Sequence, residues 1–244
     1  DLTLNDLCTR FKDGTKLFGR YYNYNEKAPV VIMIHGYRSS GYHDFCGGSV
    51  IFRNNGFNLL CISQRGHGES GGRAITFGIK EKYDVLSWIY YLIARLGNDV
   101  SIALCGTSMG AATVLMVSGL NLPKNVKAIM ADAPYSSVKE ILSLALKKFK
   151  LPQFPFMAFM TIGARIFGGF SIKDGEVASY VENSKLPLLI VHGDADHTVP
   201  YSMSQFLKEA YPEKIDFEVF PEAAHCLSYM VDEKRYTLLC DTFI

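Results

Sequence analysis

The stretch VSIALCGTSMGAATVLMVSG, residues 100–119, decides how the rest of the sequence is interpreted. It passes from apolar residues through Gly106-Thr107-Ser108-Met109-Gly110 into a second apolar run that contains good helix formers. These five residues match G-x-S-x-G, a pattern in which a serine lies on a sharp turn between a strand and a helix. The small neighbours allow the tight turn and leave the hydroxyl exposed. The pattern therefore predicts that Ser108 is a nucleophile at the end of a strand.

The overall composition favours one domain that acts on small molecules. With 244 residues, of which 48% are apolar, the chain can bury one sizeable core, so we expect a single domain over residues 1–244. A net charge of +1, without a dense run of Lys and Arg, predicts no binding of nucleic acid. No uncharged apolar stretch is long enough to span a bilayer, so the sequence carries no strong membrane signal. A small neutral or weakly charged ligand is the expected partner.

The cysteines and the first residue bear on localisation. The cysteines form no C-x-x-C pair, and Cys61 and Cys105 lie in apolar strand-like runs, where a free thiol behaves as a small hydrophobe. Reduced cysteines favour a cytoplasmic location. The chain begins at Asp1 and not at methionine, so a membrane tether through an absent N-terminal segment is the alternative.

Alternating strand-like and helix-like segments predict an α/β fold. Two β-rich runs joined at Asp13-Gly14 predict an antiparallel hairpin near the N-terminus. After it, short apolar runs predict buried strands at residues 30–34, 57–63, 100–105, 126–131, 187–192 and 216–220. Segments of helical period are expected at residues 44–55, 79–96, 109–120, 136–149, 201–211 and from about residue 227. This order predicts a doubly wound, mostly parallel sheet with helices on both faces.

One connection, residues 136–185, is too long for a simple loop and predicts a small helical lid insertion at the edge of the sheet. Pro152 and Pro155 in its middle prevent one continuous helix. In a doubly wound sheet such a segment passes over the carboxyl ends of the strands, where Ser108 is expected. Six large apolar side chains of the insertion are therefore expected to line a substrate pocket: Phe154, Phe156, Met157, Phe159, Met160 and Phe167. The alternative is that they only pack the insertion onto the core.

Three other motifs compete with Ser108. Residues 68–72 also match G-x-S-x-G, but no strand precedes Ser70 and no helix follows it. The glycines of residues 66–71 have the spacing of a dinucleotide fingerprint, yet no helix is expected to open within them. Residues 192–197, HGDADH, could hold a metal ion only with a further cluster of His and Asp, and the remaining histidines are scattered singly. We therefore expect neither a metal nor a cofactor.

A serine hydroxyl needs a base and an acid to react near neutral pH. His225 follows the last expected strand, and three candidate acids, Asp132, Asp194 and Asp196, each lie at a strand end. The order serine, acid, histidine fits a charge-relay triad. We expect His225 to be the base and Asp196 the acid. Asp194 is expected to turn away and to hydrogen-bond the backbone of its own loop, and Asp132 is an alternative acid.

Together these motifs resemble those of serine hydrolases of the α/β-hydrolase superfamily. The similar segments are HGYRSS (35–40), RGHGES (65–70), GTSMGAAT (106–113), HGDADHTVP (192–200) and AAH (223–225). The pattern is most similar to that of uncharacterised bacterial members, which often carry a membrane anchor and are related to acyl-peptidase-like members. Gln64 departs from the aspartate that many relatives have before Arg-Gly-His-Gly. The resemblance implies an oxyanion hole formed by the backbone N–H groups of Tyr37 and Met109.

The sequence thus predicts a cofactor-free serine hydrolase that cleaves carboxylic esters of small to medium acyl chains through an acyl-enzyme. A peptidase or thioesterase with the same triad is the alternative among enzymes, because amide, thioester and ester cleavage pass through similar oxyanions. The alternative from another class is a non-catalytic ligand-binding protein, which would not need all three residues of the triad.

Overall fold

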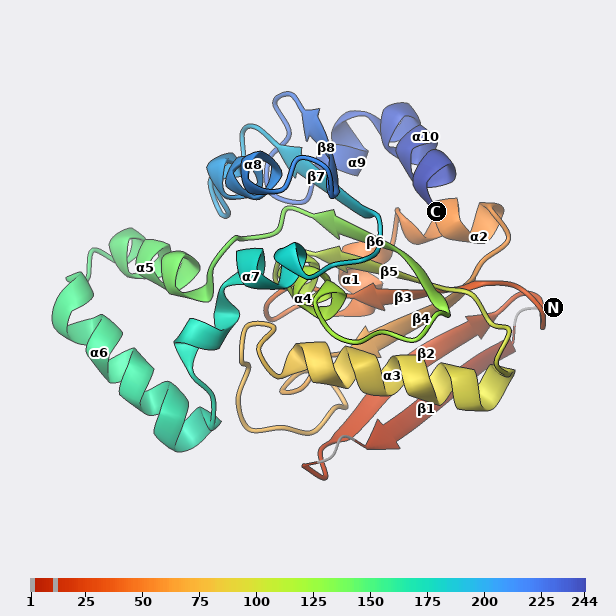
Figure 1. The fold of residues 1–244 in the computed structure, drawn as a ribbon, viewed down its shortest axis with the longest axis horizontal. Coiled ribbons are helices and arrows are strands. Elements are labelled where there is room, and N and C mark those ends of the chain that lie inside the picture. The colour runs from red at the N-terminus through yellow and green to blue at the C-terminus, as the bar shows by residue number, and fades with distance from the viewer. Residues whose placement is uncertain (1–2, 11–12) are drawn as a thin grey trace.

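An eight-stranded sheet runs through the centre of the computed structural model, which describes residues 3–10 and 13–244 (Figure 1). The strands lie in the order β1-β2-β4-β3-β5-β6-β7-β8. Their bounds are β1 (Thr3–Arg10), β2 (Lys16–Asn23), β3 (Val30–Ile34), β4 (Asn58–Ser63), β5 (Ile102–Thr107), β6 (Val126–Asp132), β7 (Leu188–Gly193) and β8 (Ile215–Phe220). β2 pairs antiparallel with β1 and β4, and the other neighbours are parallel. The predicted hairpin and the doubly wound, mostly parallel sheet are confirmed.

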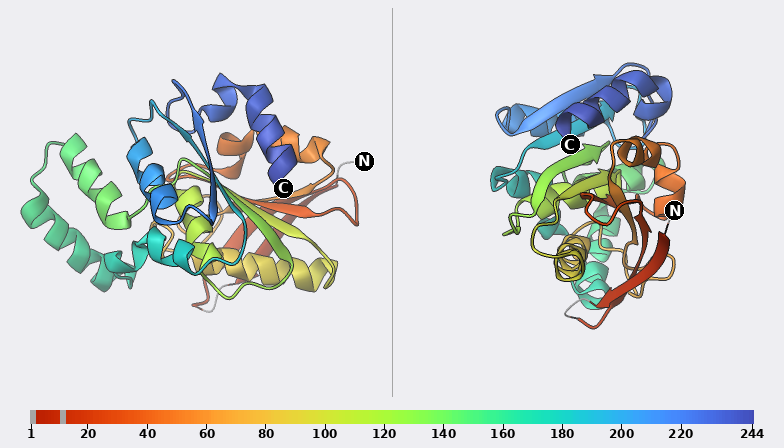
Figure 2. Two further views of the ribbon diagram at one scale, coloured as in Figure 1. Left: turned by 45° about the horizontal axis from the view of Figure 1, so that its top comes forward. Right: turned by 90° about the vertical axis from the view of Figure 1, so that its right-hand side faces the viewer.

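Helices cover both faces of the sheet (Figure 2). One face carries α3 (Glu81–Leu96), α4 (Met109–Ser118), α7 (Val177–Glu182) and α8 (Tyr201–Ala210). The other carries α1 (Gly41–Phe45), α2 (Ser49–Asn54), α9 (Ser228–Val231) and α10 (Glu233–Phe243). β3 shows how the core is divided, since Ile32 and Ile34 face the first set of helices and Val31 and Met33 face the second. Both faces of the strand are buried, which explains its continuous apolar sequence.

The predicted strands lie within two residues of the observed ones, whereas two predicted helices are wrong as single elements. In place of one helix over residues 44–55, the chain forms α1, which begins earlier at Gly41, and α2, because Gly47 and Gly48 lie between them and glycine weakens a helix interior. The last predicted helix is divided at Asp232, whose side chain accepts a hydrogen bond from Arg235 N and caps α10.

Residues 136–185 contain α5 (Val138–Lys148), α6 (Gln153–Gly163), the π-helix η1 (Ala164–Gly168), the 3-10 helix η2 (Ile172–Gly175) and α7. α5 ends before Pro152, and Phe154, which precedes Pro155, has an extended conformation inside the first turn of α6. The prolines thus lie where the helical path is interrupted. α5 and α6 extend outward beyond the end of β6, to the left in Figure 1.

Candidate active site

Ser108 lies on the turn between β5 and α4 with φ 52° and ψ −116°, a conformation that residues with a side chain rarely adopt. Hydrogen bonds hold this strained residue, because Ser108 N donates to Asp132 O at 2.8 Å and Ala112 N donates to Ser108 O at 3.0 Å. The strand-turn-helix setting expected from the sequence is therefore present.

Two glycines make the turn possible. A Cβ atom on Gly110 would lie 1.9 Å from the carbonyl oxygen of Ile34, and one on Gly106 would lie 2.3 Å from the carbonyl oxygen of Gly110. Both distances are far below van der Waals contact. Glycine at these two positions lets α4 pack directly against β3 and β5, and this packing places Ser108 at the carboxyl edge of the sheet.

The structure brings the three predicted triad residues together. His225 Nε2 lies 2.9 Å from Ser108 Oγ, and His225 Nδ1 lies 2.6 Å from Asp196 Oδ2. His225 lies in the loop between β8 and α9, and Asp196 lies in the loop after β7. The carboxyl ends of β5, β7 and β8 therefore supply one hydrogen-bonded chain from hydroxyl to imidazole to carboxylate.

The Asp196 side chain is fully buried and accepts several hydrogen bonds. Its Oδ1 accepts from Thr198 N at 2.8 Å and from Val199 N at 2.9 Å, and its Oδ2 lies 3.2 Å from His192 Nε2. Although burial favours the neutral acid, hydrogen bonds from His192 and His225 hold the pKa of Asp196 well below its usual range. Asp196 is therefore a carboxylate at neutral pH.

The prediction that Asp194 hydrogen-bonds the backbone of its own loop is wrong. Asp194 does turn away from His225, but its Oδ1 accepts from Glu222 N at 2.6 Å and so connects the loop after β7 to the loop after β8. The turn within its own loop is made by Asp196, which is two residues closer to the backbone N–H groups of Thr198 and Val199. An Asx turn needs a backbone N–H two or three residues after the aspartate, and Thr198 N and Val199 N stand at this spacing from Asp196.

Asp132 has a different partner from His225. Its Oδ2 accepts from Tyr236 OH at 3.0 Å, and its buried Oδ1 has no hydrogen-bond partner in the described part of the chain. Burial raises the pKa of Asp132 to about 6, against the opposing effect of the Tyr236 hydrogen bond. The geometry thus favours Asp196 over Asp132 as the partner of the imidazole.

The two expected oxyanion donors belong to segments that lie close to Ser108. Met109 is the first residue of α4, and a Cβ atom on Gly36, the neighbour of Tyr37, would lie 3.3 Å from Ser108 Cβ. Among residues 3–10 and 13–244, no acceptor bonds Tyr37 N or Met109 N. Their role as oxyanion donors stays a prediction.

Asp44, which sequence reasoning missed, holds the loop that contains Tyr37. Its Oδ2 accepts from Gly36 N at 2.6 Å and from Thr107 Oγ1 at 3.1 Å, so it connects this loop to the strand before Ser108. Burial disfavours its charged form, but hydrogen bonds, that from Gly36 first among them, keep the pKa of Asp44 below its usual value. One further contact fixes the loop, since Arg38 N donates to His67 Nε2 at 3.0 Å. Asp44 lies in no recognisable motif, so only the fold reveals it.

Gln64, which replaces the aspartate of many relatives, still connects its loop to the neighbouring segment, because Gln64 N donates to His35 Nε2 at 3.1 Å and the side-chain amide donates to His35 O.

The motifs that compete with Ser108 have structural roles or lack the geometry that their function needs. Ser70 Oγ accepts from Phe18 N at 2.8 Å and donates to Ser63 O at 2.5 Å. The glycines of residues 66–71 open no helix, since α3 begins only at Glu81. In the described ranges, no group of three or more His, Cys, Asp or Glu side chains is placed to hold a metal ion.

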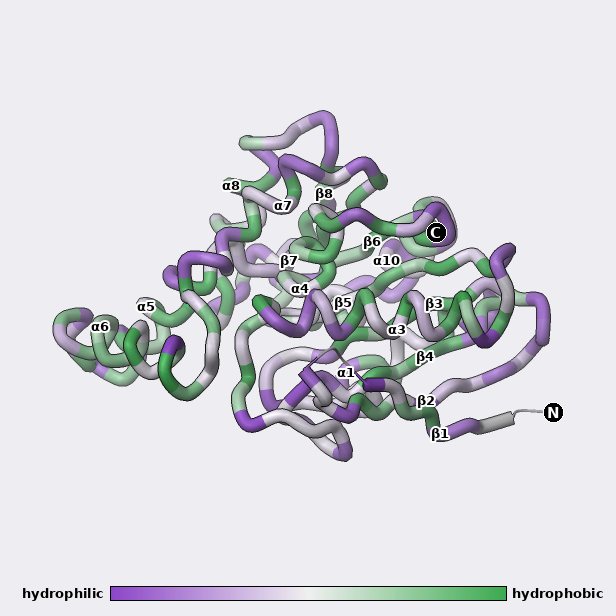
Figure 3. The backbone as a smooth tube through the Cα atoms, turned by 60° about the horizontal axis from the view of Figure 1, so that its bottom comes forward, coloured by the Kyte–Doolittle hydropathy of each residue, from purple (hydrophilic) through white to green (hydrophobic). Residues whose placement is uncertain are grey.

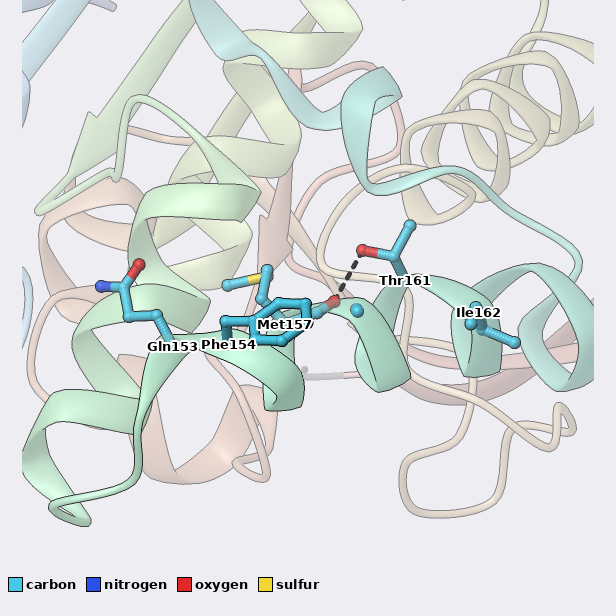
Figure 4. Close-up of a pocket in the computed structure, with 6 residues that line it drawn as sticks. Gln153, Phe154, Met157, Thr161 and Ile162 are labelled. Atoms are coloured by element: carbon cyan, nitrogen blue, oxygen red, sulfur yellow. Dashed lines mark hydrogen bonds between the residues drawn. The ribbon is translucent and has the colours of Figure 1, made fainter.

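The six expected pocket residues of the insertion divide into two groups. Met157 and Met160 pack against the core, whereas Phe154, Phe159 and Phe167 are 82%, 63% and 86% exposed and Phe156 is also exposed. A groove on α6 is lined by Gln153, Phe154, Met157, Ala158, Thr161 and Ile162 (Figure 4). The role of the six residues in a substrate pocket stays a prediction.

The alpha/beta hydrolase fold family matches residues 29–165, which is more than half of the chain. The chain belongs to the alpha/beta hydrolase fold family. This α/β-hydrolase is 24% identical to Uncharacterized protein YqkD of Bacillus subtilis, over 99% of this chain and 87% of that protein. It is 29% identical to Thiohydrolase aneE of Aspergillus aculeatus, over 50% of this chain and 39% of that protein. Among solved structures, the Pyrococcus furiosus esterase Pf2001 is similar with a TM-score of 0.79 and 24% identity, covering 99% of this chain and 92% of that one.

Proposed function

We propose that this α/β-hydrolase is a serine hydrolase that cleaves carboxylic esters through an acyl-enzyme. The observation that carries the proposal is the hydrogen-bonded chain from Ser108 Oγ through His225 to the buried carboxylate of Asp196. A carboxylate on Nδ1 keeps the proton of a neutral imidazole there, so that Nε2 is free to accept the proton of the serine. A binding protein would not need this arrangement.

The proposed reaction begins when Ser108 Oγ attacks the carbonyl carbon of the ester and His225 Nε2 takes the hydroxyl proton. The oxyanion accepts hydrogen bonds from Tyr37 N and Met109 N, and the N-terminus of α4 adds a favourable dipole. His225 then gives its proton to the leaving alcohol as the ester C–O bond breaks. In the second half, His225 deprotonates a water molecule that attacks the acyl group, and the acid leaves as Ser108 regains its proton.

Similarity to known proteins supports esters as the first substrate class. The Pyrococcus furiosus protein is named as an esterase, and the apolar insertion at the carboxyl edge of the sheet suits an acyl chain of small to medium length. The similarity to Thiohydrolase aneE makes thioesters the second class, because the same triad serves both. The third class to be tested is aminoacyl amides, which a peptidase would cleave.

A fluorophosphonate probe followed by peptide mapping tests the nucleophile. We expect the adduct on Ser108 and none on Ser70, whose hydroxyl is used within the fold. Ser108→Ala should abolish labelling and lower ester turnover by roughly 10⁶. A matched panel of esters, thioesters and amides with one acyl group then ranks the three substrate classes. An adduct on residues 68–72, or ligand binding without any turnover, would contradict the proposal.

A further inference from the structure

Helix α6 is apolar on its inner and its outer side. Its inner side packs onto the core through Met157, Met160 and, in the following turn, Ala164. The opposite side of α6 and of η1, which continues it, is here called the outer face of α6 and consists of residues that are 53% to 86% exposed: Phe159, Ile162, Ile166 and Phe167. Figure 3 shows hydrophobic colour on this projecting part of the tube. A helix that is apolar all round normally has apolar surroundings on every side, so the outer face is expected to have a partner.

Between Glu140 and Asp174, the segment that contains α6 carries charge of one sign only. Residues 141–173 contain five basic side chains and no acidic one. The rest of the chain is therefore net negative, with 24 acidic side chains against 20 basic ones. The five basic residues are all exposed, and within the described ranges none of them forms an ion pair: Lys147, Lys148, Lys150, Arg165 and Lys173. The net charge of +1 does not reveal this local positive charge, because the rest of the chain is negative and the five residues are spread along the sequence.

We propose that the outer face of α6 docks onto the surface of a bilayer that contains anionic lipid. Apolar side chains would enter the boundary between headgroups and acyl chains, and basic residues would lie at the level of the lipid phosphates. The distribution of charge along α6 fits this orientation, because three lysines precede its first turn and Arg165 follows its last. None of the described helices is long and apolar enough to cross a membrane.

A bilayer fits the outer face better than a second copy of the chain does. In a symmetric dimer the same patch meets itself, so the positively charged segment of each copy would approach that of the other. Anionic lipid supplies the opposite charge. The insertion leaves the sheet directly after β6, at the edge that carries Ser108, so a docked molecule would present this edge on the side of the bilayer (Figure 1). The proposal concerns binding and does not depend on the proposed hydrolysis.

The test uses the full chain with vesicles of phosphatidylcholine alone and with about one third phosphatidylglycerol. One variant, Ile162→Ser with Ile166→Ser, removes apolar area and leaves the predicted pocket residues intact. A second, Lys147→Gln with Lys148→Gln and Lys150→Gln, removes only charge. The matched controls are Met230→Ser with Leu238→Ser, which are exposed on α9 and α10, and Lys124→Gln with Lys127→Gln and Lys234→Gln.

Flotation should show binding of the unmodified chain that is at least about 100-fold stronger to the anionic vesicles than to the neutral ones. The lysine variant should lose roughly 100-fold, since each basic residue near an anionic surface contributes about a factor of five. The isoleucine variant should lose about tenfold, while both controls stay within about twofold and all melting temperatures stay close to that of the unmodified chain. Equal binding to both vesicles, no binding, or equal losses in the controls would overturn the proposal. So would a dimer in sedimentation that the isoleucine variant dissociates, because the outer face would then be an interface between copies.

Discussion

The variant Asp132→Asn tests whether this buried carboxyl group, which lies beside the proposed triad, acts in the stability of the fold or in catalysis. Asp132 is fully buried, accepts one hydrogen bond from Tyr236 OH, and has its pKa raised to about 6 by burial. In an unfolded chain the same carboxyl group titrates near pH 4. Between these two values the folded protein keeps a proton that the unfolded chain has released, so the stability of the fold decreases as the pH rises. Above the folded-state pKa both states are ionised and the loss is constant.

The size of this effect follows from the shift. About two pKa units at about 1.36 kcal/mol each give a total near 3 kcal/mol, of which about 2 kcal/mol is lost between about pH 4.5 and pH 8. Asparagine has no such proton, so the variant should lack this part of the pH dependence. Asparagine also places a polar group where Oδ1 has no partner in the described chain, but this cost is the same at both pH values and cancels in the comparison.

Guanidinium unfolding at the two pH values measures the difference, with the buried Trp88, the single tryptophan of the chain, as the fluorescent probe. An equal pH dependence in both proteins would refute the argument from burial. Ester turnover gives the second measurement, because Asp132→Asn should keep most activity while Asp196→Asn should lose roughly 10⁴-fold. If Asp132→Asn is the crippling change instead, the acid has been assigned to the wrong strand end.

Three further changes probe the elbow, the loop of Tyr37 and the insertion. Gly110→Ala should lower both the melting temperature and, by about 10²-fold or more, ester turnover, since its Cβ would force α4 away from Ile34 O; near-normal kinetics would contradict the elbow geometry. Asp44→Ala should lower kcat by roughly tenfold to 10²-fold with a smaller change in KM, because Gly36 N loses its acceptor, and an unchanged kcat would show that the loop keeps its position without Asp44. For straight-chain esters, kcat/KM should rise by up to about fourfold per buried methylene and then fall, and Met160→Ala, on the inner side of α6, should move the optimum to longer chains. A flat profile in both proteins would show that the insertion does not line the acyl site.

The sequence was sufficient to predict the sheet and to suggest which residues meet at its edge. Buried strands such as Val30–Ile34 are apolar on both faces, and the carboxyl ends of parallel strands share one edge whatever their distance along the chain. That topology brings His225 to Ser108 across 117 residues. The pattern G-x-S-x-G added the position of the turn, because the two glycines are required sterically.

What could not be predicted depends on contacts between segments that carry no motif. Asp44 looks like any acidic residue near a helix start until the fold places it beside Gly36 and Thr107. The sequence favours Asp196 over Asp194 as the acid, but it does not reveal the partner of Asp194, because Glu222 N reaches it only once the loop after β8 lies beside the loop after β7. The apolar residues of α6 predict a helix, but they do not tell which side the core covers.

The hydrogen bonds of Asp196 imply that its carboxylate keeps its orientation even without the imidazole of His225. Thr198 N, Val199 N and His192 hold it independently of His225. Truncating His225 to glycine would therefore leave an opening with a fixed negative charge on one side and the Ser108 hydroxyl on the other. Free imidazole from solution has the two nitrogen atoms needed to bridge them, so we expect this variant to accept its proposed general base as a diffusible ligand.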